Sequence, residues 1–574
     1  MRINRKASKK IITGLFYCSV IFVFILPLIR LLIMSFTIGD GIGLNHYREL
    51  LHEERTMNSI KNTIFIAIGA TLVSVIAGGI LAFLLAYTNI KRKKTIEVFI
   101  LSQFIIPSYI ITLAWSNLLQ AKGSINQIMM YLHLPMFNIY SIPGIIFILG
   151  LCNTPLVYMI TLHMLRKIPR DLEWAARVSG YSQWQSMIKI NLVQALPALV
   201  SGGILSFLSA MDNFSVPAFL GISSNIPVLS TYIYEKAIGF GPSAFSQAAA
   251  LSVILSIIAI TGTIFQGSFV RKSSSMDSIK EDASLRVVLQ HKTRRIVEWV
   301  VLLIFAFINI VPLTSMIITS FQKFFGGKLL ISNMTIRNYA FVFSNRGVRT
   351  AAFNSLALAL ITCIICIVIG TIIAYMKVRK NSKSVKLVEI GASLTYGVPG
   401  IVLALAMIFH WARVPNVYGT IRILMISYIT RYLVLQIKGS TTATLSVEPS
   451  LEEASAISGS SLYRTWREII IPLISKQVLV SSFFIFISSM TELTLSSMLA
   501  AAGTRTIGLT VFNLQQAGTY NISAALSVII VAFILTGYLV SVLIQKLSIA
   551  AIYKKLKTPK VFTEKIKKPC FEER

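Results

Sequence analysis

The peptide LEWAARVSG (Leu172–Gly180) returns later in the chain as LEEASAISG (Leu451–Gly459). Both copies carry glutamate at the second position, small residues in the middle and Ser-Gly at the end. Both also lie in polar loops between long apolar segments. A peptide that is used twice in equivalent surroundings indicates an internal duplication of the chain.

The duplication extends well beyond this peptide. LSAMDNFSVPAFL (Leu208–Leu220) matches ISSMTELTLSSML (Ile487–Leu499) without a gap. Three further pairs match at constant spacing: Gly78 with Gly370, Ala82 with Ala374, and Pro107 with Pro399. We therefore expect two repeats, at residues 1–272 and 296–552, joined by a polar and flexible linker at 273–295 and followed by a basic tail at 553–574.

The composition is that of a membrane protein. Of the 574 residues, 55% are hydrophobic and only 13% are charged, and the mean hydropathy is +0.73, whereas soluble proteins have about 25% charged residues. Crossing about 30 Å of hydrocarbon takes about 20 residues of helix. Apolar runs of this kind begin near Ile11, Ile60, Val98, Ser141, Ala198, Ser246, Ile296, Ala352, Val388, Gly419, Gln477 and Asn521. We expect an all-α protein of twelve transmembrane helices, arranged as two parallel six-helix repeats because each repeat has an even number of spans.

The basic residues indicate an orientation in the membrane and argue against binding to nucleic acid. The net charge of +32 is spread over short clusters beside the apolar runs, without the interleaved aromatic residues that single-strand binders use. Clusters such as KRKK (Lys91–Lys94) occur in every second loop, in the linker and at both ends of the chain. By the positive-inside rule, we expect both termini, the linker and the two repeated loops on the cytoplasmic side, with lipid as the surrounding medium.

Each repeated loop is expected to form a short helix, a glycine turn and a second helix. Glu173 and Glu452 fall near the start of the short helix, where a carboxylate suits the helix dipole. Gly180 and Gly459 permit the left-handed turn that ends it. Small side chains on one face of the short helix allow another surface to approach closely. These residues are Ala175, Ala176 and Ala454. An ordinary amphipathic interfacial loop is the alternative, but two copies in equivalent loops favour a docking element.

These loops resemble the EAA loop of inner-membrane permeases of binding-protein-dependent ABC importers. The isoleucine-rich and proline-containing continuation of that motif is present as INLVQALPAL with Pro197 and as IIIPLIS with Pro472, whereas Trp174 replaces the commoner alanine. The resemblance covers nearly the whole chain and implies the type I ABC importer permease fold. It assigns ATPase coupling to Glu173, Ala175, Ala176 and Gly180, and to Glu452, Glu453, Ala454 and Gly459.

The same resemblance implies partners and a location. They are two copies of a cytoplasmic ABC ATPase, one extracytoplasmic solute-binding protein and the bacterial cytoplasmic (inner) membrane. A phosphate-binding loop needs G-x-x-x-x-G-K-[ST], and FGGKLL (Phe325–Leu330) lacks both the spacing and the hydroxyl residue. We therefore expect a transport subunit that is not itself an enzyme and binds no cofactor, with ATP and magnesium on the partner.

The fused two-repeat form most resembles permeases for ferric iron, with thiamine and 2-aminoethylphosphonate permeases as alternatives. The segment MDNFSVPAFLG (Met211–Gly221) partly matches the iron group, with Asn213 inserted. Carboxylates inside a span are costly toward lipid and face the protein interior. Asp212, Asn213 and Glu492 could therefore line a path for a cation, or Asp212 and Glu492 could cap helix ends and accept interior hydrogen bonds.

Other chemistries are less well supported. His163 and His410 are expected to be packed or interfacial, and Cys363 and Cys366 to pack on one helix face. No His, Cys and carboxylate cluster has metal-site spacing, so we expect no fixed metal. A secondary transporter driven by an ion gradient would need coupling-ion residues in the membrane and no docking loops, and a structural or signalling component would need no transport path.

Overall fold

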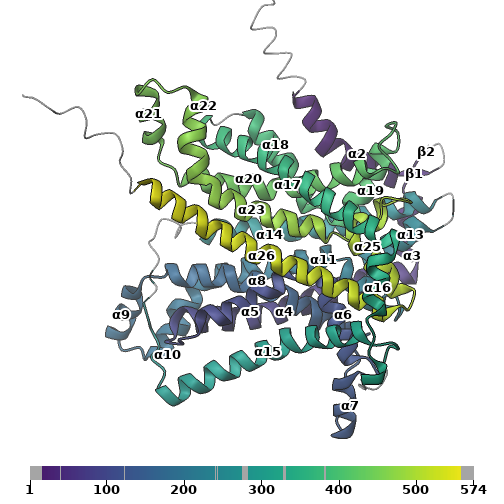
Figure 1. Cartoon of the computed structure of the whole chain (residues 1–574), viewed down its shortest axis with the longest axis horizontal. Helices are drawn as coiled ribbons and strands as arrows, with labels where there is room; N and C mark the ends of the chain where they lie inside the picture. The colour runs from purple at the N-terminus through teal and green to yellow at the C-terminus, as the bar shows by residue number, and fades with distance from the viewer. Residues whose placement is uncertain are drawn as a thin grey trace, which may run out of the picture.

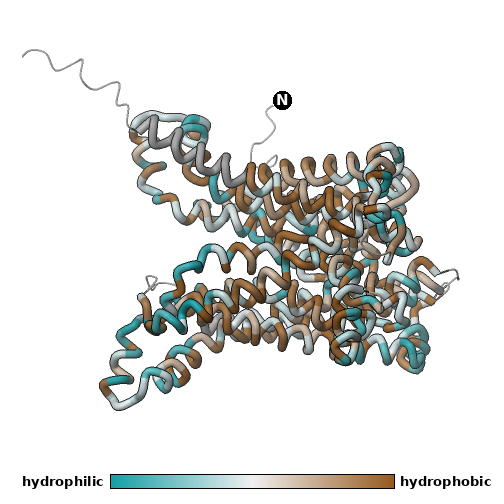
Figure 2. The backbone as a smooth tube through the Cα atoms, turned by 60° about the horizontal axis from the view of Figure 1, so that its bottom comes forward, coloured by the Kyte–Doolittle hydropathy of each residue, from teal (hydrophilic) through white to brown (hydrophobic). Residues whose placement is uncertain are grey.

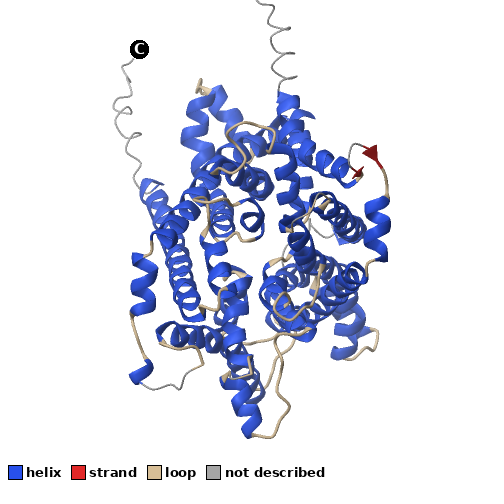
Figure 3. Ribbon diagram, turned by 90° about the vertical axis from the view of Figure 1, so that its right-hand side faces the viewer, coloured by secondary structure: helices blue, strands red, loops and turns tan. Residues whose placement is uncertain are grey.

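The structure is a computed structural model that describes residues 16–556 apart from 39–40, 122, 240, 242, 274–281, 283, 327–330 and 381–382. Helices make up nearly all of it (Figure 3), and its one small sheet pairs β1 (Thr37–Ile38) with β2 (Gly41–Ile42) in antiparallel register. Residues 557–574 of the predicted basic tail and 274–281 of the predicted linker lie outside the described residues.

The two repeats share the order of their main helices. The first consists of η1 (Ile21–Ile25), α2 (Leu26–Ser35), α3 (Asn45–His52), α4 (Glu54–Tyr87), α5 (Lys93–Ile105), α6 (Ser108–Leu119), α7 (Ser124–Tyr131), α8 (Ile142–Lys167), α9 (Arg170–Val178), α10 (Gln183–Ser186), η2 (Met187–Leu192), α11 (Val193–Asp212), α12 (Ser215–Leu220), α13 (Leu229–Ile238) and α14 (Ala244–Ser273). The second consists of α15 (His291–Phe321), η4 (Ile331–Asn333), α16 (Arg337–Ser344), α17 (Arg346–Lys380), α18 (Lys383–Gly397), α19 (Gly400–Trp411), α20 (Ile421–Leu445), α21 (Pro449–Ile457), α22 (Leu462–Thr465), η5 (Trp466–Ile470), α23 (Ile471–Met490), α24 (Thr494–Leu499), α25 (Ile507–Gln516) and α26 (Tyr520–Leu556). The predicted duplication of one parallel unit is confirmed, and α9 and α21 lie at the same end of the molecule (Figure 1).

The third span of each repeat is broken at its matched proline. α5 and the following helices bend by 102°, and α18 and α19 bend by 115°. Pro107 and Pro399 are the N-cap residues of α6 and α19. Proline lacks a backbone N–H and disfavours helical geometry in the residue before it, so a helix that meets proline ends and a new one can start in another direction.

The structure does not confirm the exact count of twelve spans. Within the described residues, nine helices are long and apolar enough to cross a membrane, and up to eleven spans result if each bent pair is one span. The remaining predicted span is α20, which carries Arg422, Arg431 and Lys438 and is less apolar than the other spans. α20 is nevertheless a long helix that packs against α17 and α23. Of its three basic residues, Arg431 is buried in the protein, whereas Arg422 and Lys438 are exposed. Apolar residues dominate the middle of the long helices (Figure 2).

Close contacts between helices depend on small residues, as is common in membranes. α4 packs along α8 and α11, and α17 packs along α20 and α23. At Gly78 on α4, an added Cβ atom would lie 2.9 Å from the backbone nitrogen of Tyr158 on α8. At the matched Gly370, it would lie 2.8 Å from Cγ of Gln436 on α20. The matched glycines therefore lie at a close contact between two helices in each repeat.

The first helix of each repeat packs against the other repeat. α2 contacts α19 of the second repeat as well as α14, and α15 contacts α5 and α6 of the first repeat as well as α26. One core of buried apolar residues runs through both repeats. The first helix of each repeat therefore packs into the other repeat, and the two repeats form a single folded body.

Candidate functional site

The two repeated peptides form the short helices α9 and α21. They lie on two separate arms at one end of the bundle (Figure 1), each directly after a long helix of its repeat, α8 or α20. Pro169 is the N-cap of α9, and Pro449 is the first residue of α21. Proline is well placed at these positions because the first N–H groups of a helix have no partner within it.

Both helices end in the left-handed glycine turn that the sequence predicts. Gly180 has φ of 91° and Gly459 has φ of 73°. The amides beyond the turn bond back across it, from Tyr181 to the Ala176 carbonyl at 3.1 Å and from Ser460 to the Ser455 carbonyl at 3.1 Å. This is the six-to-one hydrogen bond of a Schellman motif, and it sends the chain into α10 or α22 and back toward the bundle.

The two faces of each short helix differ sharply. Toward the protein, Glu173 and Ala176 of α9 are buried, as is Ser455 of α21, and Glu452 is partly buried. Outward, the apolar side chains include Val178, 87% exposed, and Ile457, 88% exposed. The other large apolar residues of this outer face are Leu172, Trp174 and Leu451.

The predicted docking residues therefore divide between the two faces. Ala175, Glu453 and Ala454 are exposed on the outer face, but Glu173 and Ala176 point inward and cannot touch a partner directly. The sequence interpretation missed the exposed apolar residues of this face. The signal was present, because Val178 and Ile457 are apolar side chains in otherwise polar loops.

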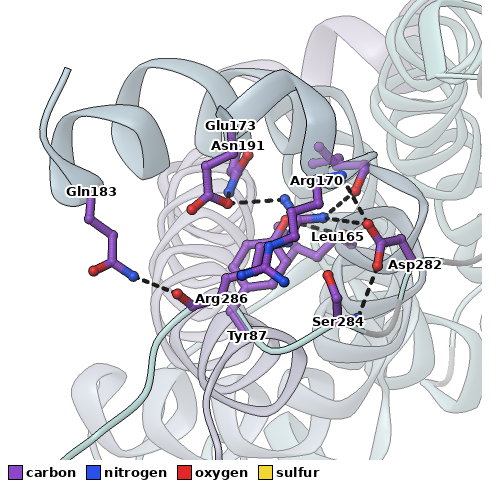
Figure 4. A network of polar contacts seen from close by, with 10 residues as sticks. Tyr87, Leu165, Arg170, Glu173, Gln183, Asn191, Asp282, Ser284 and Arg286 are labelled. Carbon is purple, nitrogen blue, oxygen red and sulfur yellow. Dashed lines mark hydrogen bonds and ion pairs between the residues drawn. The ribbon is translucent and has the colours of Figure 1, made fainter. Parts of the chain in front are cut away.

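Glu173 anchors α9 to the rest of the protein. Its carboxylate accepts a hydrogen bond from Asn191 Nδ2 at 3.4 Å and pairs with Arg286 Nη1 at 3.3 Å (Figure 4). The side chain of Arg286 is fully buried, and its Nη2 also donates to the carbonyl of Ile168. The guanidinium carbon lies 4.5 Å from the ring centre of Tyr87.

Glu452 anchors α21 in an equivalent way. Its carboxylate accepts hydrogen bonds of 2.7 Å from Tyr375 Oη and from Arg379 Nε. The Nη2 atom of Arg379 donates to the carbonyl of Val447 at 2.7 Å. The sequence interpretation treated Arg286 and Arg379 only as positive-inside residues, because nothing in a single sequence pairs them with a distant glutamate.

The three predicted path residues lie where a long helix breaks before a short one. Asn213 Oδ1 accepts the N–H of Val216 at 2.9 Å, and Glu492 Oε1 accepts the N–H of Leu495 at 2.9 Å. Asn213 and Glu492 are matched residues of the two repeats and cap the matched helices α12 and α24. Glu492 is buried and also accepts a hydrogen bond from Tyr432 Oη.

Asp212 has a different role, because it joins the repeats. Its Oδ2 lies 2.6 Å from Nη2 of Arg431 on α20, and its Oδ1 accepts the N–H of Gly400, the first residue of α19, at 2.5 Å. The two carboxylates are therefore not a free anionic pair: Arg431 compensates the charge of Asp212, and Glu492 caps a helix. These are the contacts of the alternative interpretation, in which the carboxylates cap helix ends and accept interior hydrogen bonds. Arg431 was not among the residues predicted for this site.

The described histidines and cysteines do not gather into a metal site. Among the described residues, no group of three His, Cys, Asp or Glu side chains could hold a metal ion. His410 is buried beside Phe22 and Trp411, with ring centres 4.5 Å and 4.9 Å away, while His163 is exposed. The thiol of Cys363 contacts the Ser482 carbonyl at 3.4 Å, and Cys366 is buried.

Comparison with known families supplies the identity. The family described as "Binding-protein-dependent transport system inner membrane component" matches residues 74–274 and 366–552, once in each repeat. The chain belongs to this family. It is a multi-pass permease subunit of an ABC importer in which two permease units are fused in one polypeptide.

Relatives of this permease are named for different solutes. The ferric transport system permease protein FbpB of Actinobacillus pleuropneumoniae is 24% identical over 523 residues, which cover 89% of this chain and 74% of that protein. The putative 2-aminoethylphosphonate transport system permease protein PhnU of Salmonella typhimurium is 27% identical over 201 residues, 34% of this chain and 70% of that one. A crystal structure of a bacterial alginate ABC transporter in complex with alginate pentasaccharide-bound periplasmic protein aligns with a TM-score of 0.39 at 19% identity, covering 46% of this permease and 96% of that chain.

Proposed function

We propose that this permease couples ATP hydrolysis on a partner to solute import through α9 and α21. The observation that carries the proposal is the pair of equivalent short helices, each anchored by a glutamate and each presenting an exposed apolar face at the same end of the bundle. Apolar side chains exposed together indicate a protein interface. One ATPase subunit would bind each helix, so the assembly would contain two.

The mechanism follows from the two separate arms. ATP and magnesium would bind to the ATPase subunits, and closure of the ATPase pair would draw α9 and α21 together and turn the transport path outward. Hydrolysis would return the arms. The solute would come from a binding protein on the opposite side of the membrane, as the description of the family implies.

The proposed location is the bacterial cytoplasmic membrane, with α9, α21, both termini and the segment between the repeats on the cytoplasmic side. The clusters of basic residues in these loops support this orientation. A cysteine placed at the exposed Ser458 of the α21 loop should react with an impermeant maleimide in inside-out vesicles and not in intact cells. Labelling in intact cells would overturn the orientation.

Ferric iron is the proposed solute. Its support is the similarity to FbpB over 89% of this chain, which is far more extensive than the similarity to PhnU over 34%. The proposal does not depend on the carboxylates of Asp212 and Glu492, because both are engaged by protein groups. 2-Aminoethylphosphonate is the second candidate, supported by the PhnU match, and thiamine is an untested alternative.

The test uses the complex of this permease with its ATPase in lipid vesicles. ATP hydrolysis is measured with binding protein loaded with ferric iron, with 2-aminoethylphosphonate or with thiamine. Stimulation by the iron-loaded protein alone supports the proposal, and stimulation by another loaded protein alone replaces iron by that solute. Failure of any P-loop ATPase to co-purify with the permease would overturn the coupling role of α9 and α21.

A further inference from the structure

The described part of the segment between the repeats is docked on the first repeat. Arg286 N and Val287 N both donate to the carbonyl of Tyr87 at 3.0 Å, and Leu289 and Asn89 exchange hydrogen bonds of 3.0 Å and 3.2 Å. Helix α15 already begins at His291. The expectation of a flexible linker is therefore wrong for residues 284–290, because their backbone groups find partners at the end of α4.

The same segment also holds both ends of the loop that carries α9 (Figure 4). The N–H of Asp282 donates to the Arg166 carbonyl at 2.6 Å, and its carboxylate accepts the N–H of Arg170, the first residue of α9, at 2.9 Å. Beyond the glycine turn, the side-chain amide of Gln183 donates to the carbonyl of Arg286. We call residues 282 and 284–290 the strap.

Arg286 of the strap and Arg379 of α17 make the same pair of bonds in the two repeats. Each guanidinium reaches the glutamate of the short helix and a backbone carbonyl just before that helix, Ile168 in one repeat and Val447 in the other. Ile168 and Val447 stand five residues before their glutamates in the matched segments. A planar guanidinium can serve both acceptors at once, which a single ammonium group cannot do in the same geometry.

The two arginines nevertheless come from different parts of the chain. The constant spacing that matches Gly78 with Gly370 and Ala82 with Ala374 matches Tyr87 with Arg379. The last residue of α4 is thus an aromatic where α17 has the arginine. Arg286 stacks on the ring of Tyr87. Its guanidinium thereby reaches Glu173, for which α4 has no arginine at the position that matches Arg379.

We propose that Arg286 is a positioning residue for the docking helix α9, supplied by the strap because the first repeat lacks the arginine that α17 supplies for α21. The inference rests on the proposed coupling role of α9 and extends it. The strap, which connects the two repeats, would then help to transmit motion from the first ATPase subunit through α9 to the transmembrane helices.

The test measures the position of α9 without an ATPase. In a background with the five native cysteines replaced, a cysteine at the buried Ala176 reports on α9, and one at the matched buried Ser455 reports on α21. Labelling by a hydrophilic maleimide is followed on the detergent-solubilised full chain. Arg286→Met keeps an apolar stem against Tyr87 but leaves Glu173 buried and without its charge partner. Lys292→Ala, an exposed basic residue beyond the strap, is the matched control.

We expect Arg286→Met to raise the labelling rate at position 176 by on the order of tenfold or more, because a buried carboxylate without its partner strongly disfavours the docked state. The rate at position 455 should stay unchanged, and Lys292→Ala should alter neither. Arg379→Ala should show the reverse, with a rise at position 455 alone. Adding Tyr87→Arg to Arg286→Met rebuilds the arrangement of the second repeat and should restore protection at position 176.

An unchanged rate at position 176, or an equal rise at both positions, would overturn the positioning role. If Arg286→Met does not yield a folded protein, the maleimide labelling rates at positions 176 and 455 are measured for Arg286→Lys instead. We then expect a smaller rise at position 176 and no change at position 455. Uptake of radiolabelled ferric iron separates this inference from the proposed function. A specific rise at position 176 with normal uptake and normal ATPase binding would leave the positioning role intact and refute coupling through α9.

Discussion

Asp212 at the end of α11 and Arg431 in the middle of α20 form a 2.6 Å ion pair between the two repeats. Arg431 is 9% exposed, whereas Asp212 is 36% exposed, so the pair lies at the edge of the protein interior. The carboxylate also accepts the first N–H of α19. One side chain thus fastens the first repeat to two helices of the second.

We expect Asp212→Asn to destabilise the protein by about 1–3 kcal/mol, because Arg431 would remain buried without its charge partner and the partial exposure of Asp212 reduces the loss. The apparent Tm in detergent measures the effect. The double variant Asp212→Asn/Arg431→Met removes the unpaired charge and should recover part of the loss. A Tm for Asp212→Asn equal to that of the parent protein would show that the pair contributes nothing to stability.

Glu492 should tolerate loss of its charge but not loss of its side chain. Glu492→Gln keeps an oxygen for the N–H of Leu495 and a polar group for Tyr432, and the matched Asn213 caps α12 without any charge. Solute uptake should remain near normal. Glu492→Ala removes a cap worth about 1 kcal/mol and leaves a buried tyrosine hydroxyl unsatisfied, so the apparent Tm should fall. If Glu492→Gln abolishes uptake while leaving the Tm unchanged, the carboxylate acts on the solute path after all.

Substitution of Gly459 should test the turn that ends α21. Open space surrounds the position, since an added Cβ would meet nothing within 4 Å. The cost of Gly459→Ala is therefore that of a left-handed backbone alone, about 1–2 kcal/mol. Gly459→Val should cost more, and Gly459→Asn less, because asparagine tolerates this conformation. ATPase co-purification should fall in the same order, and equal co-purification by all three variants would exclude a role for the turn in docking.

The strap should remain docked down to mildly acidic pH. Burial alone would raise the pKa of Asp282, but hydrogen bonds from Ser284 and from the Arg170 amide, together with the charge of Arg286, lower it below its ordinary value. A lowered folded-state pKa means that this stabilisation is complete above the ordinary pKa of about 4 and is lost as the pH falls through the lowered value.

Hydrogen exchange of residues 168–180, corrected for the intrinsic pH dependence, measures this effect. Protection should be constant from pH 7 to about 5, which lies above the ordinary pKa of an aspartate. It should be reduced at all pH values in Asp282→Asn, which serves as the control. A loss of protection in the parent protein well above pH 5 would contradict the assignment to Asp282.

The duplication and the helix-turn-helix form of the two repeated loops were predictable because their signals are local. Gly180 and Gly459 predict a left-handed turn. The matched residues Pro107 and Pro399 are a local signal for the breaks in the third spans. The inward orientation of Glu173 was not predictable, since it depends on Arg286, more than a hundred residues away. The sequence predicts a span near Gly419, and α20 is a long helix there, although it is less apolar than the other spans. A basic residue is unfavourable in a membrane span when it has no partner. Arg431 forms an ion pair with Asp212 of the other repeat, which the sequence of α20 alone does not show.

The exchanged first helices have a consequence for how the chain is made. α2 enters the bilayer early in synthesis, yet its packing partner α19 lies almost four hundred residues later in the sequence. Arg30 on α2 donates to the carbonyl of His410 at 2.9 Å. The Arg30 guanidinium can therefore form this hydrogen bond only after the second repeat has been inserted. The packing around α2 is therefore complete only when both repeats are present, and a chain truncated between the repeats would leave Arg30 without this acceptor.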